Sequence, residues 1–418
     1  MFAPLKLILE RIPVQGHVVF RDAYGEFQSF GDCTQPRILV ALADKRVERE
    51  LALNPELALG EAYMDGRLTI LEGSLYGLIE ALLAGGGDKR LPAWTQAFHA
   101  LKALTKPISQ FNPIDRARRN VAHHYDIDGA IYDLFLDPDR QYSCAYFEDD
   151  AQGLESAQVA KKRHLAAKLA LERGQRVLDI GSGWGGLGLY LAQVADVDVT
   201  GITLSTEQLQ IAEARARRLR LDGRVRFNFV DYREVTDRFD RIVSVGMFEH
   251  VGVTHYDDYF RQIAACLVED GVAVVHSIGR SDTPTVTNPF IAKHIFPGGY
   301  IPALSEVLPA IERAGLILTD LEILRLHYAE TLRAWRERFM ANRAKAAALR
   351  DERFCRMWEF YLAGSEAAFR YQNLMVFQLQ LTKRVDALPI TRSYMAEAEA
   401  RLAERERRLA EPVQMAGE

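Results

Sequence analysis

Residues 177–186, VLDIGSGWGG, constrain the fold of this chain most, because an apolar run reaches Asp179 and four glycines then fall within six positions. This pattern is typical of a buried parallel strand that enters a tight turn and then a helix, with bare backbone where a ligand can approach. Open α/β sheets bind nucleotides at the carboxyl ends of their strands, beside such a turn. The sequence therefore predicts an α/β sheet with a nucleotide-like cofactor next to Asp179.

Further strands are expected to end at the same edge of the sheet, because consecutive βαβ units lie side by side. Their expected ranges are 197–203, 225–229, 239–246 and 271–279. Many dinucleotide enzymes place an acidic residue after the second strand to bind the ribose hydroxyls, but this chain offers Thr203 and Gln208 there. Ser205 and Gln208 have the spacing of a helix capping box. Thr203 and Gln208 are candidates for ligand contact in addition to that local role.

The later strand ends also carry polar residues. Asp231-Tyr232-Arg233 follows the third strand, on the adenine side of a nucleotide cleft, and the fourth strand delivers residues 247–252, MFEHVG, to the same edge. His276 is the lone histidine of an apolar strand, where a satisfied core residue is the usual interpretation. Its place near a strand end favours a functional role instead.

The composition excludes several classes of protein. The 418 residues carry a net charge of −5, so no global field attracts the chain to nucleic acid. The arginine-rich helix around 215–220 has no interleaved aromatic residues, so a solvated face explains it better than RNA binding. Four separate cysteines without CxxC spacing favour a reducing compartment and argue against a zinc site, and we expect no metal. No apolar run approaches ~20 residues, and the apolar start is too short for a signal peptide and breaks at Pro13.

The length suggests roughly two to three domains. Residues 1–110 are interpreted as a small α+β domain with strands at 14–20 and 37–42 and a helical stretch over 54–83 that breaks at Gly66. The boundary is placed between about residues 106 and 120. Residues 111–390 form the expected cofactor domain, which ends with a strand at 316–326 and long helices at 331–349 and 354–383. The tail, 391–418, is interpreted as a solvent-exposed helix, with a weak partner contact as the alternative.

Two irregular segments are candidates for lining a ligand. Residues 141–147, QYSCAYF, mix aromatic and polar side chains that are costly in a core unless they line something, although simple packing remains an alternative. Residues 283–302 form a long loop of the kind that often serves as a lid. We expect this loop to expose apolar side chains suited to a greasy substrate, namely Phe290, Ile291, Ile295, Phe296 and Tyr300.

Six ordered motifs carry a family resemblance: QYSCAYF, VLDIGSGWGG, GITLSTEQ, DRIVSVGMFEHVG, VHSIG and YIPALSEV. Their order and spacing resemble the cyclopropane-fatty-acyl-phospholipid synthase family, which includes the mycolic acid cyclopropane synthases. The resemblance covers about residues 120–390, and GEAYMDG resembles the small leading domain of the bacterial phospholipid enzymes. It implies a Rossmann-like class I methyltransferase sheet with a small α+β amino-terminal domain and long carboxyl-terminal helices.

The resemblance also implies a reaction. The methyl group of S-adenosylmethionine is transferred to the cis double bond of an unsaturated phospholipid acyl chain, and a carbocation forms. Loss of a proton to a bound bicarbonate then closes the cyclopropane ring. The matching catalytic positions are Cys144, Glu249, His276, the backbone of Ile278, and Tyr328. The matching cofactor positions are Tyr142, Ser143, Asp179, Gly181, Ser182, Gly183, Trp184, Gly185, Thr203, Leu204, Gln208, Tyr232 and Arg233.

These residue types suit that chemistry. His276 and Tyr328 can donate hydrogen bonds to an anion, and Glu249 can accept the proton of a bicarbonate hydroxyl. A preorganised anion in a dry pocket stabilises a developing cation. Tyr125 and Tyr146 can add cation–π support, whereas core packing is preferred for Phe147.

One position departs from the family pattern. Ser365 stands where family members commonly carry a cysteine, so a methylene or methyl-branched product is an alternative to the cyclopropane. An inactive lipid-binding protein is a third hypothesis, and an RNA methyltransferase ranks lower.

The resemblance also implies a homodimer in the cytoplasm, associated peripherally with the inner face of the membrane, and no nucleic-acid partner. Candidate docking elements are the 283–302 loop, Lys102 and the arginines of 116–119.

Overall fold

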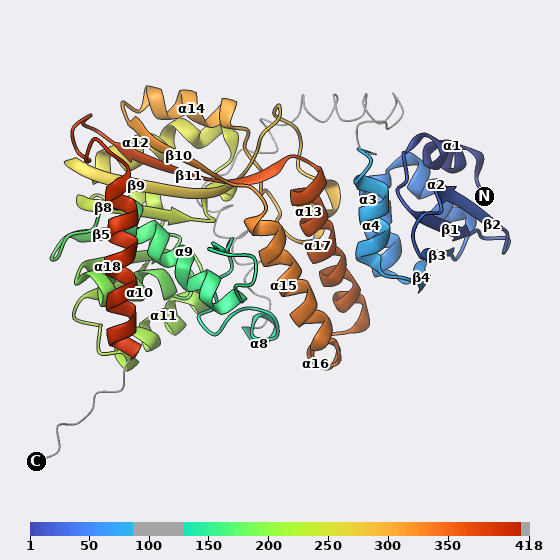
Figure 1. Cartoon of the computed structure of the whole chain (residues 1–418), viewed down its shortest axis with the longest axis horizontal. Coiled ribbons are helices and arrows are strands. Elements are labelled where there is room, and N and C mark those ends of the chain that lie inside the picture. Colours follow the sequence, from blue (N-terminus) through green and yellow to red (C-terminus); the bar gives the residue numbers. More distant parts are fainter. Residues whose placement is uncertain (87–128, 411–418) are drawn as a thin grey trace, which may run out of the picture.

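The computed structural model describes residues 1–86 and 129–410, which form a small amino-terminal domain and a larger domain built on a seven-stranded sheet (Figure 1). The expected boundary between residues 106 and 120 lies outside the described residues. The same is true of Lys102, Tyr125 and the arginines of 116–119.

Within the described residues 1–86, the amino-terminal domain is a four-stranded sheet of order β2-β1-β3-β4 with four helices. Strand β1 runs antiparallel to β2 and parallel to β3, and β3 pairs antiparallel with β4. The elements are α1 (Ala3–Arg11), β1 (His17–Arg21), β2 (Phe27–Gly31), β3 (Arg37–Leu42), α2 (Lys45–Leu53), α3 (Pro55–Met64), β4 (Leu68–Glu72) and α4 (Leu75–Leu83). The predicted α+β character of this part is thus present in the structure.

The expected helical stretch over 54–83 is wrong in its middle, because residues after Gly66 form β4. Leu68 pairs with Leu42 of β3, and Ile70 pairs with Val40. Pairing with a distant strand satisfies the backbone of this short apolar run, and helical spacing in the sequence cannot reveal that pairing.

The larger domain confirms the predicted class I methyltransferase sheet. Its strand order is β10-β11-β9-β8-β5-β6-β7, in which β11 runs antiparallel to both of its neighbours. The strands are β5 (Arg176–Ile180), β6 (Asp198–Thr203), β7 (Val225–Phe229), β8 (Phe239–Val245), β9 (Leu267–Arg280), β10 (Ile317–Leu324) and β11 (Leu374–Thr382). Strands β7, β6, β5, β8 and β9 are mutually parallel, so their carboxyl ends meet at one edge.

Helices cover both faces of this sheet (Figure 1). One face carries α9 (Leu154–Lys168), α10 (Gly186–Ala195) and α11 (Thr206–Arg218), and the other carries α12 (Tyr256–Cys266) and α14 (Leu304–Arg313). The other elements are α8 (Gly129–Tyr132), η2 (Tyr232–Glu234), η3 (Phe248–His250), η4 (Val253–His255), α13 (Pro289–His294), α15 (His327–Ala341), α16 (Arg343–Leu349), α17 (Glu352–Tyr371) and α18 (Ser393–Ala410). None of the described helices is long and apolar enough to cross a bilayer.

The expected helix over 354–383 is also wrong in its second half. Helix α17 ends at Tyr371, and Asn373 adopts a left-handed backbone with φ of 59° that turns the chain into β11. Strand β11 fills the gap between β9 and β10, and its side chains are buried almost throughout. The run read as one helix therefore supplies an interior strand of the sheet.

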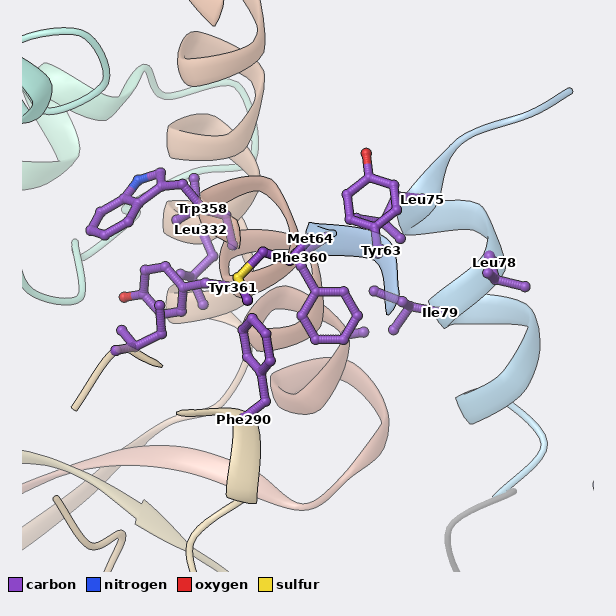
Figure 2. Close-up of a cluster of buried hydrophobic side chains, with 14 of the residues drawn as sticks. Tyr63, Met64, Leu75, Leu78, Ile79, Phe290, Leu332, Trp358, Phe360 and Tyr361 are labelled. Atoms are coloured by element: carbon purple, nitrogen blue, oxygen red, sulfur yellow. The ribbon is translucent and has the colours of Figure 1, made fainter. Parts of the chain in front are cut away.

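The apolar side chains expected to be exposed in the lid over 283–302 are not exposed. Phe290, Ile295 and Tyr300 are buried, and α13 packs against α3 of the amino-terminal domain. The ring of Phe290 lies 4.7 Å from that of Phe360, and a Cβ on Gly60 would meet Phe290 at 2.3 Å. Figure 2 shows this cluster joining α3 and α4 to α13, α15 and α17. Phe290 thus serves domain packing, whereas Tyr300 belongs to the core on the sheet and Phe296 packs against His250 and Tyr361.

Replacing Phe290 by Ala is expected to lower the stability of the chain by roughly 3–5 kcal/mol, because the ring is fully buried and Gly60 leaves no side chain to refill the space. Thermal unfolding followed by circular dichroism measures this. Phe27→Ala is the matched control, since Phe27 is 60% exposed and should change little. Equal melting temperatures for the two variants would contradict the packing role.

The tail forms α18, which packs on α9 and α10 and is not a free solvent helix. His164 of α9 lies between Glu399 of α18 and Glu322 of β10, and the hydroxyl of Tyr190 donates to Glu406. These contacts hold the tail in place. The composition of the tail shows its charged residues but not the residues with which they pair.

Candidate active site

The carboxyl edge of the sheet, together with residues 140–143 above it, encloses a cleft. It contains every residue expected to hold the cofactor except Gly185: Tyr142, Ser143, Asp179, Gly181, Ser182, Gly183, Trp184, Thr203, Leu204, Gln208, Tyr232 and Arg233 all line it. Gly185 sits just behind, where a Cβ would come within 2.7 Å of Phe227 and 2.9 Å of Ala212. This glycine therefore lets the turn pack closely on the sheet and on α11.

The glycine turn leaves space on the cleft side. Gly181 and Gly183 have positive φ angles of 82° and 54°, which favour glycine. No atom lies within 4 Å of where a Cβ on Gly183 would stand, whereas Met247 closes the space beside Gly181. A ligand can thus approach the backbone at Gly183.

Asp179 is a buried carboxyl at the end of β5 with an unused acceptor. Its Oδ2 atom has no hydrogen-bond partner among the described residues. Burial raises its pKa to about 7, and the nearby Lys161 ammonium opposes the shift. An orphaned buried acceptor on a cleft wall fits a ligand that brings a hydrogen-bond donor or a cation.

The capping box expected of Ser205 and Gln208 at the end of β6 is only partly present. Ser205 caps α11, since its hydroxyl accepts from the backbone N–H of Gln208, but the capping box does not form. The side chain of Gln208 instead accepts a hydrogen bond from the Thr203 hydroxyl at 2.9 Å. Both side chains are buried against the cleft, which leaves them available for the ligand contact expected of them.

The end of β7 brings Asp231 to the cleft, as expected from its place after the third strand, although it is not among the cofactor positions that the family resemblance implies. Its carboxylate is 1% exposed and accepts two hydrogen bonds of 2.8 Å from the Arg233 guanidinium. Arg233 also stands over the ring of Tyr232 at 5.4 Å. The three residues form one rigid unit at the cleft wall.

The 141–147 segment lines the cleft only at its start. The hydroxyl of Tyr142 lies 2.9 Å from that of Tyr361 in α17, and the N–H of Ala145 donates to Thr331 in α15. Tyr146 stacks between His164 and His327, away from the cleft-lining residues. Gln141, Tyr142 and Ser143 are thus the cleft-lining residues of this segment, and the residues after them pack on helices.

Glu249 and Ile278 come together at the ends of β8 and β9. The Glu249 Oε1 atom accepts a 2.6 Å hydrogen bond from the Ile278 N–H, and Oε2 is buried without a partner among the described residues. Burial raises the pKa of Glu249 to about 7, so this side chain can hold or release a proton near neutral pH.

His276 lies on the face of β9 that α9 covers. Its Nδ1 atom is 3.1 Å from the Gln378 amide nitrogen, and burial beside Lys161 lowers its pKa well below the usual value, which keeps the ring neutral. The structure does not bring its ring into hydrogen-bond contact with Glu249. Side chains alternate between faces along β9, and Glu249 approaches the Ser277 side of the strand.

Cys144 and Tyr328 lie near the cleft but do not line it. The buried Cys144 thiol donates to the carbonyl of Ala145, and burial raises its pKa, so it remains a thiol. Tyr328 packs against Trp335 and Phe369, with ring centroids 5.8 and 4.8 Å away. Among the described residues, no group of three or more His, Cys, Asp or Glu side chains is placed to hold a metal ion.

The cleft also contains residues that sequence reasoning missed. Lys161 carried no signal, because its stretch of the sequence indicated only a helix. Tyr361, which bonds to the cleft residue Tyr142 without lining the cleft itself, lay within another expected helix. His250, next to Glu249 in the sequence, lines the cleft, and burial lowers its pKa to about 4. Only the adjacency of His250 to Glu249 could have marked any of them beforehand.

Sheet order, glycine turn and cleft together define a class I S-adenosylmethionine-dependent methyltransferase. A family model described as mycolic acid cyclopropane synthetase matches residues 113–379. The chain belongs to this family. A second model, for a domain of unknown function, matches residues 8–86.

Individual relatives agree with this assignment. The Escherichia coli cyclopropane-fatty-acyl-phospholipid synthase is 38% identical over 79% of this chain and 84% of its own length. The Mycobacterium tuberculosis tuberculostearic acid methyltransferase UfaA1 is 34% identical over 88% of each chain. The crystal structure of the mycolic acid cyclopropane synthase CmaA1 complexed with SAH and CTAB superimposes with a TM-score of 0.61 at 32% identity, covering 65% of this chain and 99% of that one.

Proposed function

We propose that this enzyme transfers the methyl group of S-adenosylmethionine to the cis double bond of an unsaturated phospholipid acyl chain and closes a cyclopropane ring. The observation that carries the proposal is the Glu249 carboxyl, which is buried beside the cleft with Oε1 held by Ile278 and Oε2 unused. The name of the Escherichia coli relative supports the substrate class.

The residues around the cleft suit the cofactor. S-adenosylmethionine supplies an electrophilic methyl group when it is bound. Gly183 leaves bare backbone for close approach, Asp179 offers a free acceptor, and Gln208 and Tyr232 also line the cleft. These residues bind and orient the cofactor in the proposed mechanism.

Proton removal is assigned to the region of Glu249. A bound bicarbonate supplies the base when present, and the unused Oε2 of Glu249 fits its hydroxyl. The Ile278 N–H donates to Oε1 of that carboxylate, and contact of the Ile278 backbone with the anion stays part of the proposal. Neutral His276 and the Tyr328 hydroxyl are the proposed hydrogen-bond donors to the other oxygens of the bicarbonate. Cys144 is assigned to the wall of the same site as a buried thiol.

The acyl chain has to be reached at a membrane surface. We propose peripheral association with the inner face of the membrane, with the amino-terminal domain as the docking part and a homodimer as the assembly. The division into residues 1–110, 111–390 and 391–418 remains part of this proposal.

A product without a ring is the second candidate, and one relative favours it. The tuberculostearic acid methyltransferase is similar to this chain over most of its length. Ser365, which stands in the place of the family cysteine, is half-buried on α17, one turn from Tyr361. Because Tyr361 bonds to the cleft residue Tyr142, a change on this helix can reach the site that discharges the cation.

Lipid analysis decides between these products. Expression in a host that lacks its own synthase is expected to give fatty acids one carbon heavier that contain a ring and no alkene, as measured by gas chromatography with mass spectrometry. A heavier product that retains an alkene, or a saturated methyl branch, would support the second candidate. Unchanged lipids despite cofactor binding would leave the inactive lipid-binding hypothesis in place of both.

A further inference from the structure

Lys161 is a buried lysine whose side chain ends at the cleft. It lies on α9 and is 1% exposed, and its Nζ atom donates to the Gln141 side-chain oxygen at 2.7 Å and to the Ser143 hydroxyl at 2.8 Å. Gln158, one turn earlier, donates to the carbonyls of the same two residues. Helix α9 therefore holds residues 141–143, which line the cofactor cleft, through four hydrogen bonds.

The charge of Lys161 is not neutralised by a direct ion pair. Both of its hydrogen-bond partners in the described chain are neutral oxygens, and the carboxyls of Asp137 and Asp179 interact with it without a direct hydrogen bond. Burial lowers its pKa to about 8, and Asp137 opposes the shift. An ammonium in such a place is costly unless a negative group comes to it.

The bonds of Lys161 also set the direction of the Ser143 hydroxyl. An ammonium is only a donor, so the Ser143 oxygen must accept from it, and the hydroxyl hydrogen is left to donate elsewhere. Ser143 lines the cleft, which leaves the cleft as the available direction. Lys161 thus turns Ser143 into a donor for an anion.

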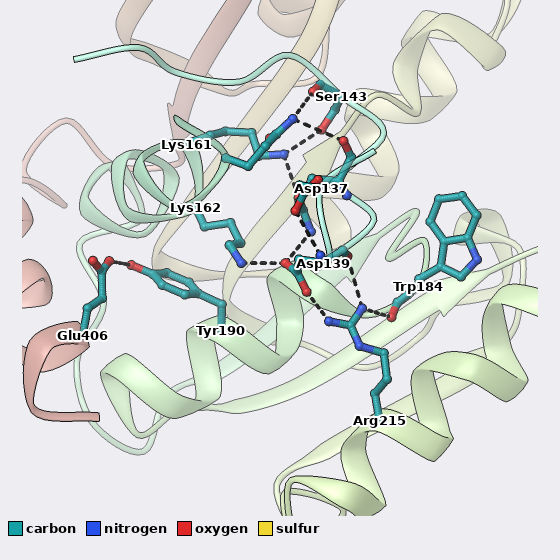
Figure 3. A network of polar contacts seen from close by, with 11 residues as sticks. Asp137, Asp139, Ser143, Lys161, Lys162, Trp184, Tyr190, Arg215 and Glu406 are labelled. Carbon is teal, nitrogen blue, oxygen red and sulfur yellow. Dashed lines mark hydrogen bonds and ion pairs between the residues drawn. The ribbon is translucent and has the colours of Figure 1, made fainter. Parts of the chain in front are cut away.

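The same segment is tied to the glycine turn from its other side (Figure 3). Asp139 bonds to Lys162 and Arg215, and Arg215 donates to the carbonyl of Trp184 at 2.8 Å. These contacts fix where the segment lies. Within this network, Lys161 is the side chain that both lines the cleft and carries a charge not neutralised by a direct ion pair.

We propose that Lys161 is a positioning residue for the carboxylate of the methionine portion of the cofactor, acting through Ser143 and through its charge. The unpartnered Oδ2 of Asp179 would accept from the ammonium group of that same amino acid. The two ends of the zwitterion meet opposite charges, which distinguishes the intact cofactor from adenosine compounds that lack the amino acid. This inference rests on the proposed cofactor binding but not on the identity of the lipid product.

The test compares two ligands in two variants by titration calorimetry. Lys161→Met is expected to weaken S-adenosylhomocysteine roughly 10- to 100-fold, the range for losing a hydrogen-bonded charge. It should leave 5′-methylthioadenosine, which has no carboxylate, within about twofold of the parent. Lys168→Met is the matched control, because Lys168 is equally buried on the same helix but pairs with Glu322 away from the cleft. It should leave both affinities unchanged even if it lowers stability.

A loss shared equally by both ligands would reduce Lys161 to a structural residue and overturn the proposal, as would an unchanged affinity for S-adenosylhomocysteine. If Lys161→Met does not fold, Ser143→Ala provides the same test, since it removes the hydroxyl and keeps the lysine. It must show the same selective loss. Failure to find a cyclopropane product would contradict the proposed function without changing these binding results.

Discussion

Replacing Glu249 by Gln is expected to lower kcat by roughly 10²- to 10⁴-fold, the usual contribution of a positioned proton-transfer group. The amide keeps the oxygen that accepts from Ile278, so the local fold is retained, but the unused Oε2 becomes a nitrogen that cannot take a proton. Turnover of labelled S-adenosylmethionine on vesicles of unsaturated phospholipid measures the loss, and the affinity for S-adenosylhomocysteine should not change.

The free energy of unfolding of Glu249→Gln is also expected to depend on pH differently from that of the parent. The folded-state pKa of Glu249, about 7, lies above its ordinary value of 4.5, so the folded chain retains a proton that the unfolded chain releases between these pH values. This group therefore costs stability progressively as pH rises from about 4.5 to 7. Removing it should make Glu249→Gln more stable relative to the parent at pH 8 than at pH 5. The activity of the parent should rise with pH through about 7 as the carboxyl ionises.

Glu359→Gln is the matched control for the activity measurement. Glu359 is also a largely buried carboxyl with a raised pKa, but it bonds to Tyr63 at the domain interface and does not line the cleft. Its replacement should leave kcat within about twofold, as expected for a residue remote from the chemistry. Retention of full activity by Glu249→Gln would remove Glu249 from the mechanism.

Replacing Gly183 by Leu is expected to abolish cofactor binding while the chain still folds. The new side chain enters open space on the cleft wall and occupies the volume that a ligand needs. The affinity for S-adenosylhomocysteine should fall by two orders of magnitude or more, about 3 kcal/mol. Titration calorimetry measures it on protein whose fold is checked by circular dichroism.

Gly174→Leu controls for backbone strain. Gly174 also has a positive φ, 81° against 54° for Gly183, and has equally open space around its Cβ position, but it precedes β5 and lies outside the cleft. Both variants should lose roughly 1–2 kcal/mol of stability from the left-handed backbone. Only Gly183→Leu should lose the ligand, and equal binding by the two variants would place the cofactor elsewhere.

Much of the cofactor site could be predicted from the sequence. A strand that ends in Asp179 and a glycine turn has few alternatives, because those glycines adopt backbone angles that other residues avoid. The helix cap at Ser205 also depends only on neighbouring residues, and the structure confirms it. The strand β11 could not be predicted, since its apolar run continues the pattern of α17 and only pairing with β9 and β10 makes it a strand.

The prediction of an exposed apolar lid at 283–302 was wrong for a related reason. Apolar residues between turn signals suit a lid and an interface equally well, and only the packing of Phe290 on Gly60 and Phe360 distinguishes them. The sequence does not indicate which surface will be covered by another domain. Here that domain lies more than 200 residues earlier in the chain.

By itself, then, the sequence determined the class of sheet, the cofactor turn and the family, because each depends on backbone requirements and motif order within short stretches. Only the tertiary structure decided which side chains face one another at the site. Ile278 orients Glu249, Gln378 holds His276, and α9 brings Lys161 to Ser143. These pairs form between separate elements, where burial strengthens charge and hydrogen bonding, and neither partner indicates the other before the chain is folded.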